Sequence, residues 1–205
     1  MGLLIAIDRH IAAGTADLRA GTWNKKAYSK AEGLFGRRMG IIGVGDIGIA
    51  TAARASAFGI DVVAVTKPGR SDLAVARAEA ADITFVDTLD ELLATSDIVS
   101  LHVPGSTDTK GMVDAAFLAK MKDGAVLLNT SRGDVVDEAA LKDALKAGKL
   151  RGVGLDVYVG EFDRLPDPEL WADDRVLFTP HISAATDIRS TRQIDLFCDN
   201  LEAYV

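Results

Sequence analysis

The 205-residue sequence has few of the features that mark secreted, membrane-bound or repetitive proteins. Its one cysteine, Cys198, excludes an internal disulfide and predicts a reducing, cytoplasmic setting. There is no internal repeat and no low-complexity linker. The apolar run at 3–7 ends at Asp8 and Arg9, too early for a membrane span or a signal peptide. We therefore expect no association with a membrane.

The chain also has fewer basic than acidic residues. The chain has 23 Lys and Arg against 30 Asp and Glu, which gives a net charge of −7 and a pI near 5.0. A protein that binds nucleic acid usually presents a basic face, so we expect no nucleic-acid partner. Hydrophobic residues make up 48% of the chain, enough for the core of one large domain or two small ones.

The most informative stretch lies between residues 39 and 66. An apolar run at 39–44 predicts a buried parallel strand, and it leads into Gly43, Gly45 and Gly48 with the spacing G-x-G-x-x-G. An Ala-rich helix at 46–58 and a second β-branched strand follow. A strand, a glycine turn, a helix and a strand within about thirty residues are typical of a dinucleotide site, where phosphate lies at the helix N-terminus. The alternative is a βαβ turn with a structural role only.

Strands and helices alternate through the rest of the chain. This pattern predicts an α/β fold of the Rossmann type, doubly wound, with a mainly parallel sheet of about seven strands and helices on both faces. The predicted strands lie at 39–44, 61–65, 83–86, 97–102, 125–129, 152–157 and 175–178. We place this core at 39–180 within a dinucleotide-binding domain at 1–205.

A helix is expected on each side of the core. The first, at 1–20, has one apolar face and must either pack on the sheet or meet a second subunit. Its apolar residues are Leu4, Ile7, Ile11 and Leu18. The second, at 184–205, is expected to close the domain. Its apolar residues are Ile194, Phe197, Leu201 and Tyr204.

The residues after the second strand bear on the choice of cofactor. An NAD site normally places an acidic residue there to bind the ribose 2′-hydroxyl, but this chain has Thr66, Lys67 and Arg70. A carboxylate would repel a 2′-phosphate, whereas Lys67 and Arg70 would attract one. The segment therefore favours NADP over NAD. The alternative is that both are solvated loop charges.

Three later strands end in residues suited to catalysis. Arg132 follows the fifth strand, and its guanidinium can bind a carboxylate through two hydrogen bonds. Asp156 lies at the end of the sixth strand, with Glu161 five residues later. His181 follows the seventh as a general acid or base, and Glu161 beside it would stabilise the protonated ring. Singly, these could be a surface ion pair, a solvated acid and a helix-start residue. Together they predict an active site without a metal.

Four segments, in order along the chain, carry a resemblance to a known family. They lie at 40–48, 124–137, 154–157 and 179–181. The chain resembles the NAD(P)-binding domain of the D-isomer-specific 2-hydroxyacid dehydrogenases over essentially its whole length. The resemblance implies that Arg132 binds the substrate carboxylate and carbonyl, that His181 exchanges a proton with the C2 oxygen, and that Glu161 pairs with His181. The implied reaction is hydride transfer between nicotinamide and C2 of a 2-oxo acid such as glyoxylate or hydroxypyruvate.

The resemblance extends the list of cofactor contacts. It places Asp156 at the nicotinamide end, Asp46 and Ile47 at the pyrophosphate, and the remaining residues along the groove. The predicted cofactor-binding residues are Gly43, Gly45, Asp46, Ile47, Gly48, Thr66, Lys67, Arg70, Val103, Pro104, Thr109, Thr130, Ser131, Arg132, Asp156 and His181. The resemblance also implies a homodimer through this domain, with the first helix and Trp23 in the interface.

Three differences from the family pattern limit what is expected. Members of the family are longer and have a substrate-binding domain that is largely absent here, so this chain is expected to be a fragment that binds dinucleotide with little turnover. The loop at 158–161 lacks the usual prolines, and Thr66 stands where an acid is usual. The alternative is a non-catalytic dinucleotide sensor like the corepressors of this fold. An alanine dehydrogenase would match the glycines but not the order of Arg132, Glu161 and His181.

Overall fold

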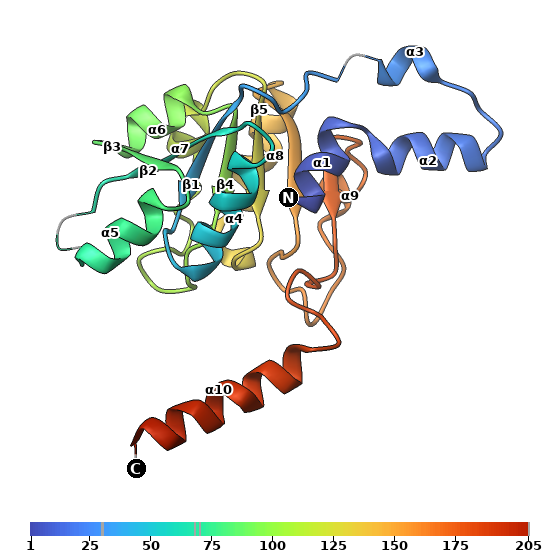
Figure 1. Ribbon diagram of the computed structural model, residues 1–205. Coiled ribbons are helices and arrows are strands. Elements are labelled where there is room, and N and C mark those ends of the chain that lie inside the picture. The colour runs from blue at the N-terminus through green and yellow to red at the C-terminus, as the bar shows by residue number, and fades with distance from the viewer. Residues whose placement is uncertain (30, 68, 70, 205) are drawn as a thin grey trace.

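A computed structural model describes residues 1–29, 31–67, 69 and 71–204 (Figure 1). Within these residues, seven strands form one sheet in the order β3-β2-β1-β4-β5-β6-β7, and every neighbouring pair is parallel. The strands are β1 (Arg38–Ile42), β2 (Asp61–Val65), β3 (Ile83–Val86), β4 (Ile98–Leu101), β5 (Ala125–Asn129), β6 (Leu150–Leu155) and β7 (Val176–Phe178). The predicted doubly wound α/β fold is confirmed.

Most helices follow the predicted alternation with the strands. They are α1 (Gly2–Asp8), α2 (Ile11–Arg19), α3 (Lys25–Tyr28), α4 (Asp46–Ser56), α5 (Asp72–Glu79), α6 (Leu89–Thr95), α7 (Ala115–Lys120), α8 (Glu138–Lys146), α9 (Pro168–Trp171) and α10 (Arg189–Tyr204), with a 3-10 turn at Gly133–Val135. The sequence did not predict α3 and α9. Each has four residues, too few to show a helical period. In the described residues, no helix is both long and apolar enough to cross a bilayer.

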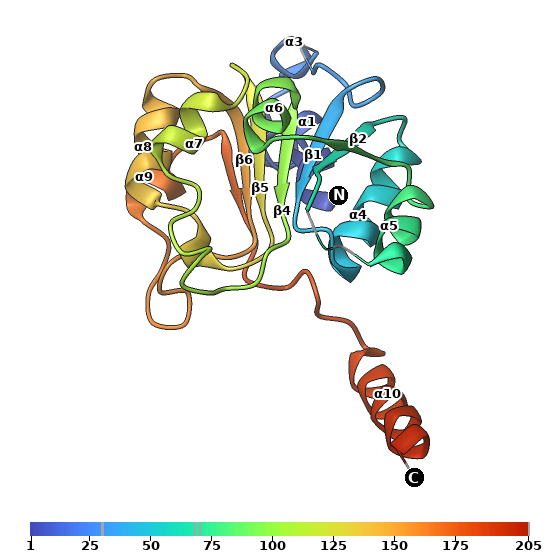
Figure 2. The same ribbon diagram turned by 90° about the vertical axis from the view of Figure 1, so that its left-hand side faces the viewer.

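The sheet is covered on both faces, as Figure 2 shows. Successive strand residues point to opposite faces, so they enter two separate cores. In β2, Val62 and Ala64 pack in the layer that contains residues of α1, α4 and α5, whereas Val63 packs in the layer of α6, α7 and α8. The continuous apolar runs of the sequence are therefore explained by burial on both faces.

The first twenty residues form two helices instead of the single helix expected. His10 separates α1 from α2 with a positive φ of 51°, a conformation rarely adopted by a residue other than glycine. Helix α1 packs against β6, where buried Asp8 pairs with Arg151 at 3.5 Å. Helix α2 has no buried residue, and with α3 it projects from the body of the molecule (Figure 1). The apolar stripe continues across the break, and so the sequence did not reveal it.

The carboxyl ends of all seven parallel strands lie at one edge of the sheet. The chain order reverses between β1 and β4, and open α/β sheets bind their ligands at such a reversal.

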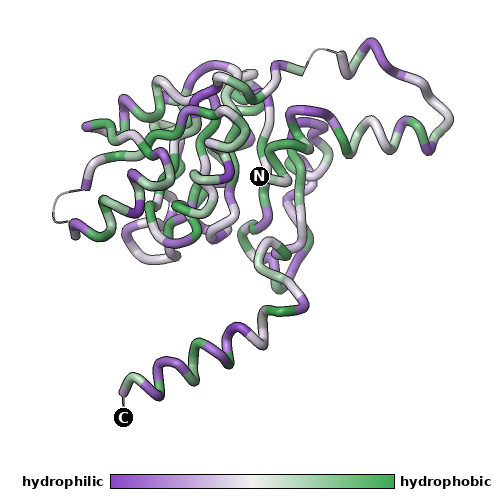
Figure 3. Tube along the Cα trace, in the orientation of Figure 1, coloured by the Kyte–Doolittle hydropathy of each residue, from purple (hydrophilic) through white to green (hydrophobic). Residues whose placement is uncertain are grey.

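Helix α10 leaves from the same edge and extends away from the domain in both views (Figures 1 and 2). Hydrophobic and hydrophilic residues alternate along it (Figure 3). The helix expected at 184–205 therefore exists, but its apolar residues, such as Phe197, are exposed.

Candidate active site

The glycine turn after β1 has two glycines that folding requires and one that it does not. Gly43 has a φ of 103°, and a Cβ there would overlap the His102 carbonyl. A Cβ at Gly48 would overlap the Gly43 carbonyl oxygen. At Gly45, however, φ is −97° and a Cβ would meet no heavy atom within 4 Å. The space beside Gly45 is open, as a site for a closely approaching phosphate requires.

Helix α4 begins at this turn without a side-chain cap. Its N-cap residue is Gly45, and the first backbone bond of the helix runs from the Ile49 N–H to the Gly45 carbonyl at 2.9 Å. The amides at the start of a helix have no partner within the helix, and the helix dipole is positive there. The turn is therefore suited to an anion such as the pyrophosphate of a dinucleotide. Asp46 and Ile47 are exposed beside it.

A cleft of about 740 Å³ opens next to the turn. It is lined by α1, the start of α4 and the ends of β4 to β7. Of the predicted cofactor residues it contains Ile47, Thr130 and Asp156. The rest of its lining is Met1, Gly2, Leu3, Ala6, Thr51, Ser100, His102, Leu128, Leu177, Thr179, Ile182, Ser183 and Ala184. Sequence reasoning missed the contribution of α1, because it depends on packing between segments far apart in the chain.

His102 lies in this cleft as a neutral side chain. Its Nε2 is 2.9 Å from the Ser100 hydroxyl. Burial, with a smaller effect of the nearby Met1 ammonium, lowers the pKa of His102 to about 4. The ring is therefore uncharged near neutral pH, and it is not the acid that a reducing reaction would need.

The turn after β5 is organised by Asn129, whose role the sequence did not reveal. Its buried Oδ1 accepts hydrogen bonds from the Ser131 N–H (3.0 Å) and hydroxyl (2.8 Å), and its Nδ2 donates to the Arg132 carbonyl at 2.8 Å. The Arg132 side chain is exposed and donates to the Ser131 carbonyl at 2.7 Å. Within the described part of the chain it forms no ion pair. Its guanidinium therefore remains available for an anion.

Asp156 at the end of β6 holds the segment that carries His181. Its carboxylate is 1% exposed and accepts hydrogen bonds from the Thr179 hydroxyl, the Ile182 N–H (3.0 Å) and the Ser183 N–H (2.9 Å). Burial alone would raise the pKa of Asp156, but hydrogen bonds from Ser183, Thr179 and Ile182 outweigh it and hold the pKa below its usual value. The His181 N–H also donates to the Asp156 carbonyl at 2.9 Å.

His181 and Glu161 form the pair expected from the sequence. The Nδ1 of His181 lies 2.8 Å from the Glu161 Oε1, and the Glu161 side chain is only 11% exposed. Glu161 also accepts the Tyr158 N–H at 3.3 Å. The pair leaves Nε2 as the ring nitrogen that can exchange a proton with a ligand. The exposed ring of Phe162 lies beside the His181 ring, with the two ring centroids 6.2 Å apart.

The structure brings some of the other predicted residues together. The turn that carries Arg132 touches the loop before Glu161, since a Cβ at Gly133 would overlap the Tyr158 backbone. Arg132 itself makes no hydrogen bond to Glu161 or His181 in the described residues. Its placement beside the pair rests on the adjacency of β5, β6 and β7.

The predicted residues of the adenosine end and of the loop after β4 lie at the same edge of the sheet. Thr66 and Lys67 are exposed at the end of β2, and Arg70 lies outside the described residues. Val103 and Pro104 follow β4, and the Thr109 hydroxyl donates to the Pro104 carbonyl at 2.7 Å, which closes that loop.

Comparison with known proteins agrees with this geometry. The family described as "D-isomer specific 2-hydroxyacid dehydrogenase, NAD binding domain" matches residues 1–183. A hydroxypyruvate reductase of Thermotoga maritima is 42% identical over 191 residues, which cover 91% of this chain and 58% of that protein. A D-3-phosphoglycerate dehydrogenase of Mycobacterium leprae is 40% identical over 187 residues, 91% of this chain and 34% of its own length.

Solved structures show the same relationship. A D-lactate dehydrogenase of Aquifex aeolicus, crystallised with NAD and lactic acid, superposes with a TM-score of 0.82 at 29% identity. The superposition covers 99% of this chain and 63% of that one. The chain therefore spans between about a third and two thirds of the length of these relatives.

Proposed function

This chain belongs to the D-isomer specific 2-hydroxyacid dehydrogenase family, and we propose that it forms the dinucleotide-binding and catalytic half of an oxidoreductase. The reaction is hydride transfer between a nicotinamide cofactor and C2 of a small 2-oxo or 2-hydroxy acid. The observation that carries the proposal is the His181–Glu161 pair at the sheet edge that also holds the open glycine turn. No observation on this chain favours the alternative of a non-catalytic dinucleotide sensor.

Three side chains divide the work at the substrate. The guanidinium of Arg132, which forms no ion pair within the described residues, binds the substrate carboxylate and polarises the C2 carbonyl. Glu161 pairs with Nδ1 and orients the imidazole of His181, whose Nε2 delivers a proton as the C2 oxygen becomes an alkoxide. A nicotinamide bound in the cleft would supply or accept the hydride. Asn129 and Asp156 hold the two turns that present these groups.

We assign the cofactor as a nicotinamide dinucleotide with a preference for NADP. Support comes from the end of β2, where Thr66 and Lys67 are exposed and no carboxylate follows the strand before Ser71. An exposed ammonium there would attract a 2′-phosphate. Arg70 belongs to the same prediction but lies outside the described residues. The preference predicts tighter binding of NADPH than of NADH.

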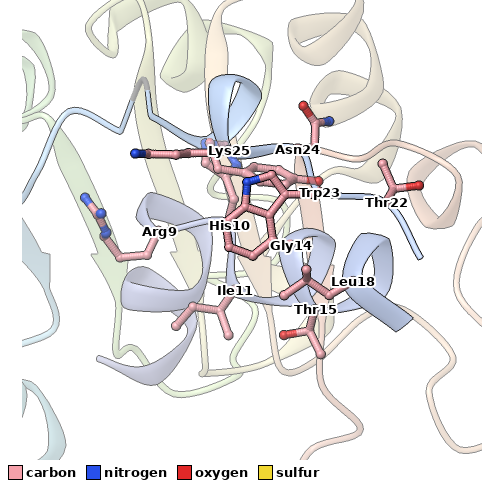
Figure 4. A pocket seen from close by; sticks show the side chains of 11 residues that line it. Arg9, His10, Ile11, Gly14, Thr15, Leu18, Thr22, Trp23, Asn24 and Lys25 are labelled. Carbon is pink, nitrogen blue, oxygen red and sulfur yellow. The ribbon is translucent and has the colours of Figure 1, made fainter. Parts of the chain in front are cut away.

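We further propose a homodimer through the projecting α2–α3 arm. Three large apolar side chains are exposed there: Ile11 (50%), Leu18 (57%) and Trp23 (79%). They surround a hollow of about 400 Å³, over which Trp23 lies (Figure 4). A second copy of the chain would cover this surface and remove the cost of its exposure. Sedimentation should show a dimer for the wild type and a monomer for Trp23→Glu. A wild-type monomer at high concentration would contradict this.

The central experiment uses the 205-residue chain itself. Titration with NADH and NADPH should show saturable binding of each, and absence of binding would refute the proposal. Oxidation of either by glyoxylate or hydroxypyruvate should be slow, because Arg132 and His181 are open to water. The residual rate should disappear in His181→Ala, whereas NADH and NADPH should still show saturable binding to this variant. A rate typical of complete family enzymes would show that no covering domain is needed.

A cytoplasmic location remains a prediction from the single cysteine.

A further inference from the structure

An ion pair links the start of α4 to the neighbouring helix α5. Asp46 is the first residue of α4, and its Oδ1 lies 2.5 Å from the Nη2 of Arg77 on α5. The two side chains are 84% and 52% exposed. Helix α4 precedes β2 and α5 follows it, so the pair spans the end of β2, where the adenosine ribose lies in folds of this type. None of the roles assigned above uses Arg77.

The charge of Asp46 conflicts with the ligand expected at this turn. A carboxylate in the first turn stabilises a helix whose N-terminus binds no other anion, because it faces the positive end of the helix dipole. A dinucleotide brings two further negative charges to the same amides, beside the open space at Gly45. Like charges at a protein surface repel one another more strongly than they would in bulk water, because the effective dielectric constant is lower there. An uncompensated Asp46 would therefore weaken dinucleotide binding.

We propose that Arg77 is a positioning residue that compensates the charge of Asp46 and so allows the phosphates to bind. This rests on the proposed dinucleotide site. The exposure of the pair means that it adds little to folding stability, so its main effect is on the electrostatic potential at the turn. The compensation acts on the pyrophosphate, which NADH and NADPH share.

A double-mutant cycle on the 205-residue chain tests this. In Arg77→Gln, affinity for both NADH and NADPH should fall about tenfold. In the double variant Asp46→Asn with Arg77→Gln, affinity should return to within about twofold of the wild type. Arg77→Lys should keep most of the affinity, because it keeps the charge. The loss in Arg77→Gln should shrink as salt is raised, since exposed charges are screened.

Arg38→Gln is the matched control. Arg38 pairs with Asp61 at 2.8 Å, and this pair is also exposed (38% and 50%), but it lies at the opposite, amino-terminal edge of the sheet. It should leave both affinities unchanged, and melting curves should show that all variants are folded. Unchanged affinity in Arg77→Gln, or no recovery in the double variant, would overturn the inference. So would a loss confined to NADPH that persists with Asp46→Asn, which would make Arg77 a direct 2′-phosphate ligand. If the wild type binds neither dinucleotide, the proposed function fails first.

Discussion

Replacing Gly45 by alanine should separate binding from folding. The backbone at Gly45 (φ −97°, ψ −169°) is accessible to any residue, and the new methyl group would meet no heavy atom within 4 Å. Alanine is a poorer N-cap than glycine, but it also lowers the entropy of the unfolded chain by about 0.4–1 kcal/mol. These effects oppose each other, so the free energy of unfolding should change by less than about 1 kcal/mol.

Binding should respond quite differently. The methyl group would occupy the space through which a pyrophosphate approaches the amides of α4. Each hydrogen bond from an amide to a charged acceptor contributes about 1.5–3 kcal/mol, so losing one should raise the Kd for NADH about ten- to one-hundred-fold. The assay is nucleotide fluorescence titration, paired with urea unfolding of the same sample.

Gly48→Ala provides the contrast. Its Cβ would overlap the Gly43 carbonyl oxygen, a backbone atom that cannot move aside freely. We expect a loss of about 1–3 kcal/mol in the free energy of unfolding, as for overpacked cores. Wild-type affinity for NADH in Gly45→Ala, or unfolding as easy as that of Gly48→Ala, would contradict these expectations.

Three further perturbations test other parts of the site. The pKa of His102 in the folded chain, about 4, lies below its ordinary value of 6.5. Between these two values the unfolded chain binds a proton that the folded chain does not, so the free energy of unfolding decreases as the pH is lowered from about 6.5 to 4. Urea unfolding should show a loss of about 2 kcal/mol between pH 7 and pH 5 that is absent in His102→Gln. Asp156→Asn should lower the free energy of unfolding by about 2 kcal/mol and speed amide exchange at Ser183, because an amide group replaces an acceptor of buried hydrogen bonds. Lys67→Glu should weaken NADPH binding about tenfold and leave NADH binding nearly unchanged in fluorescence titrations, and equal losses would contradict the NADP preference.

Local sequence determined the sheet because the strands are buried on both faces. β2, β3 and β5 have the predicted bounds, and the other strands differ from the predicted bounds by two residues or fewer at each end. The glycine turn was equally readable from its spacing, although only Gly48 is required by a contact within the motif, whereas Gly43 lies against the His102 carbonyl after β4. The break between α1 and α2 could not be predicted, because the residue with the positive φ is His10 and no glycine or proline marks the position.

The candidate site was predictable to the extent that it follows the strand ends. His181 and Glu161 follow adjacent strands of one parallel sheet, so both the predicted topology and the family resemblance indicated their pairing. The role of Asn129 depends on the shape of the turn after β5, which a single asparagine does not specify. The ion pair of Asp46 with Arg77 joins residues far apart in the chain, and no local pattern predicts it.

The buried and exposed polar groups of the site have different tasks. Asn129 and Asp156 are each 1% exposed, and their hydrogen bonds fix two turns, whereas Arg132 and His181, which those turns carry, face solvent. These hydrogen bonds are made by residues of the chain itself, which lowers the cost of ordering the two turns on binding. Water nevertheless reaches the 39%-exposed His181 side chain, and proton delivery to an alkoxide is most effective where water is excluded. Dinucleotide affinity should therefore depend on this chain alone, and turnover on a surface that covers the carboxyl edge of the sheet.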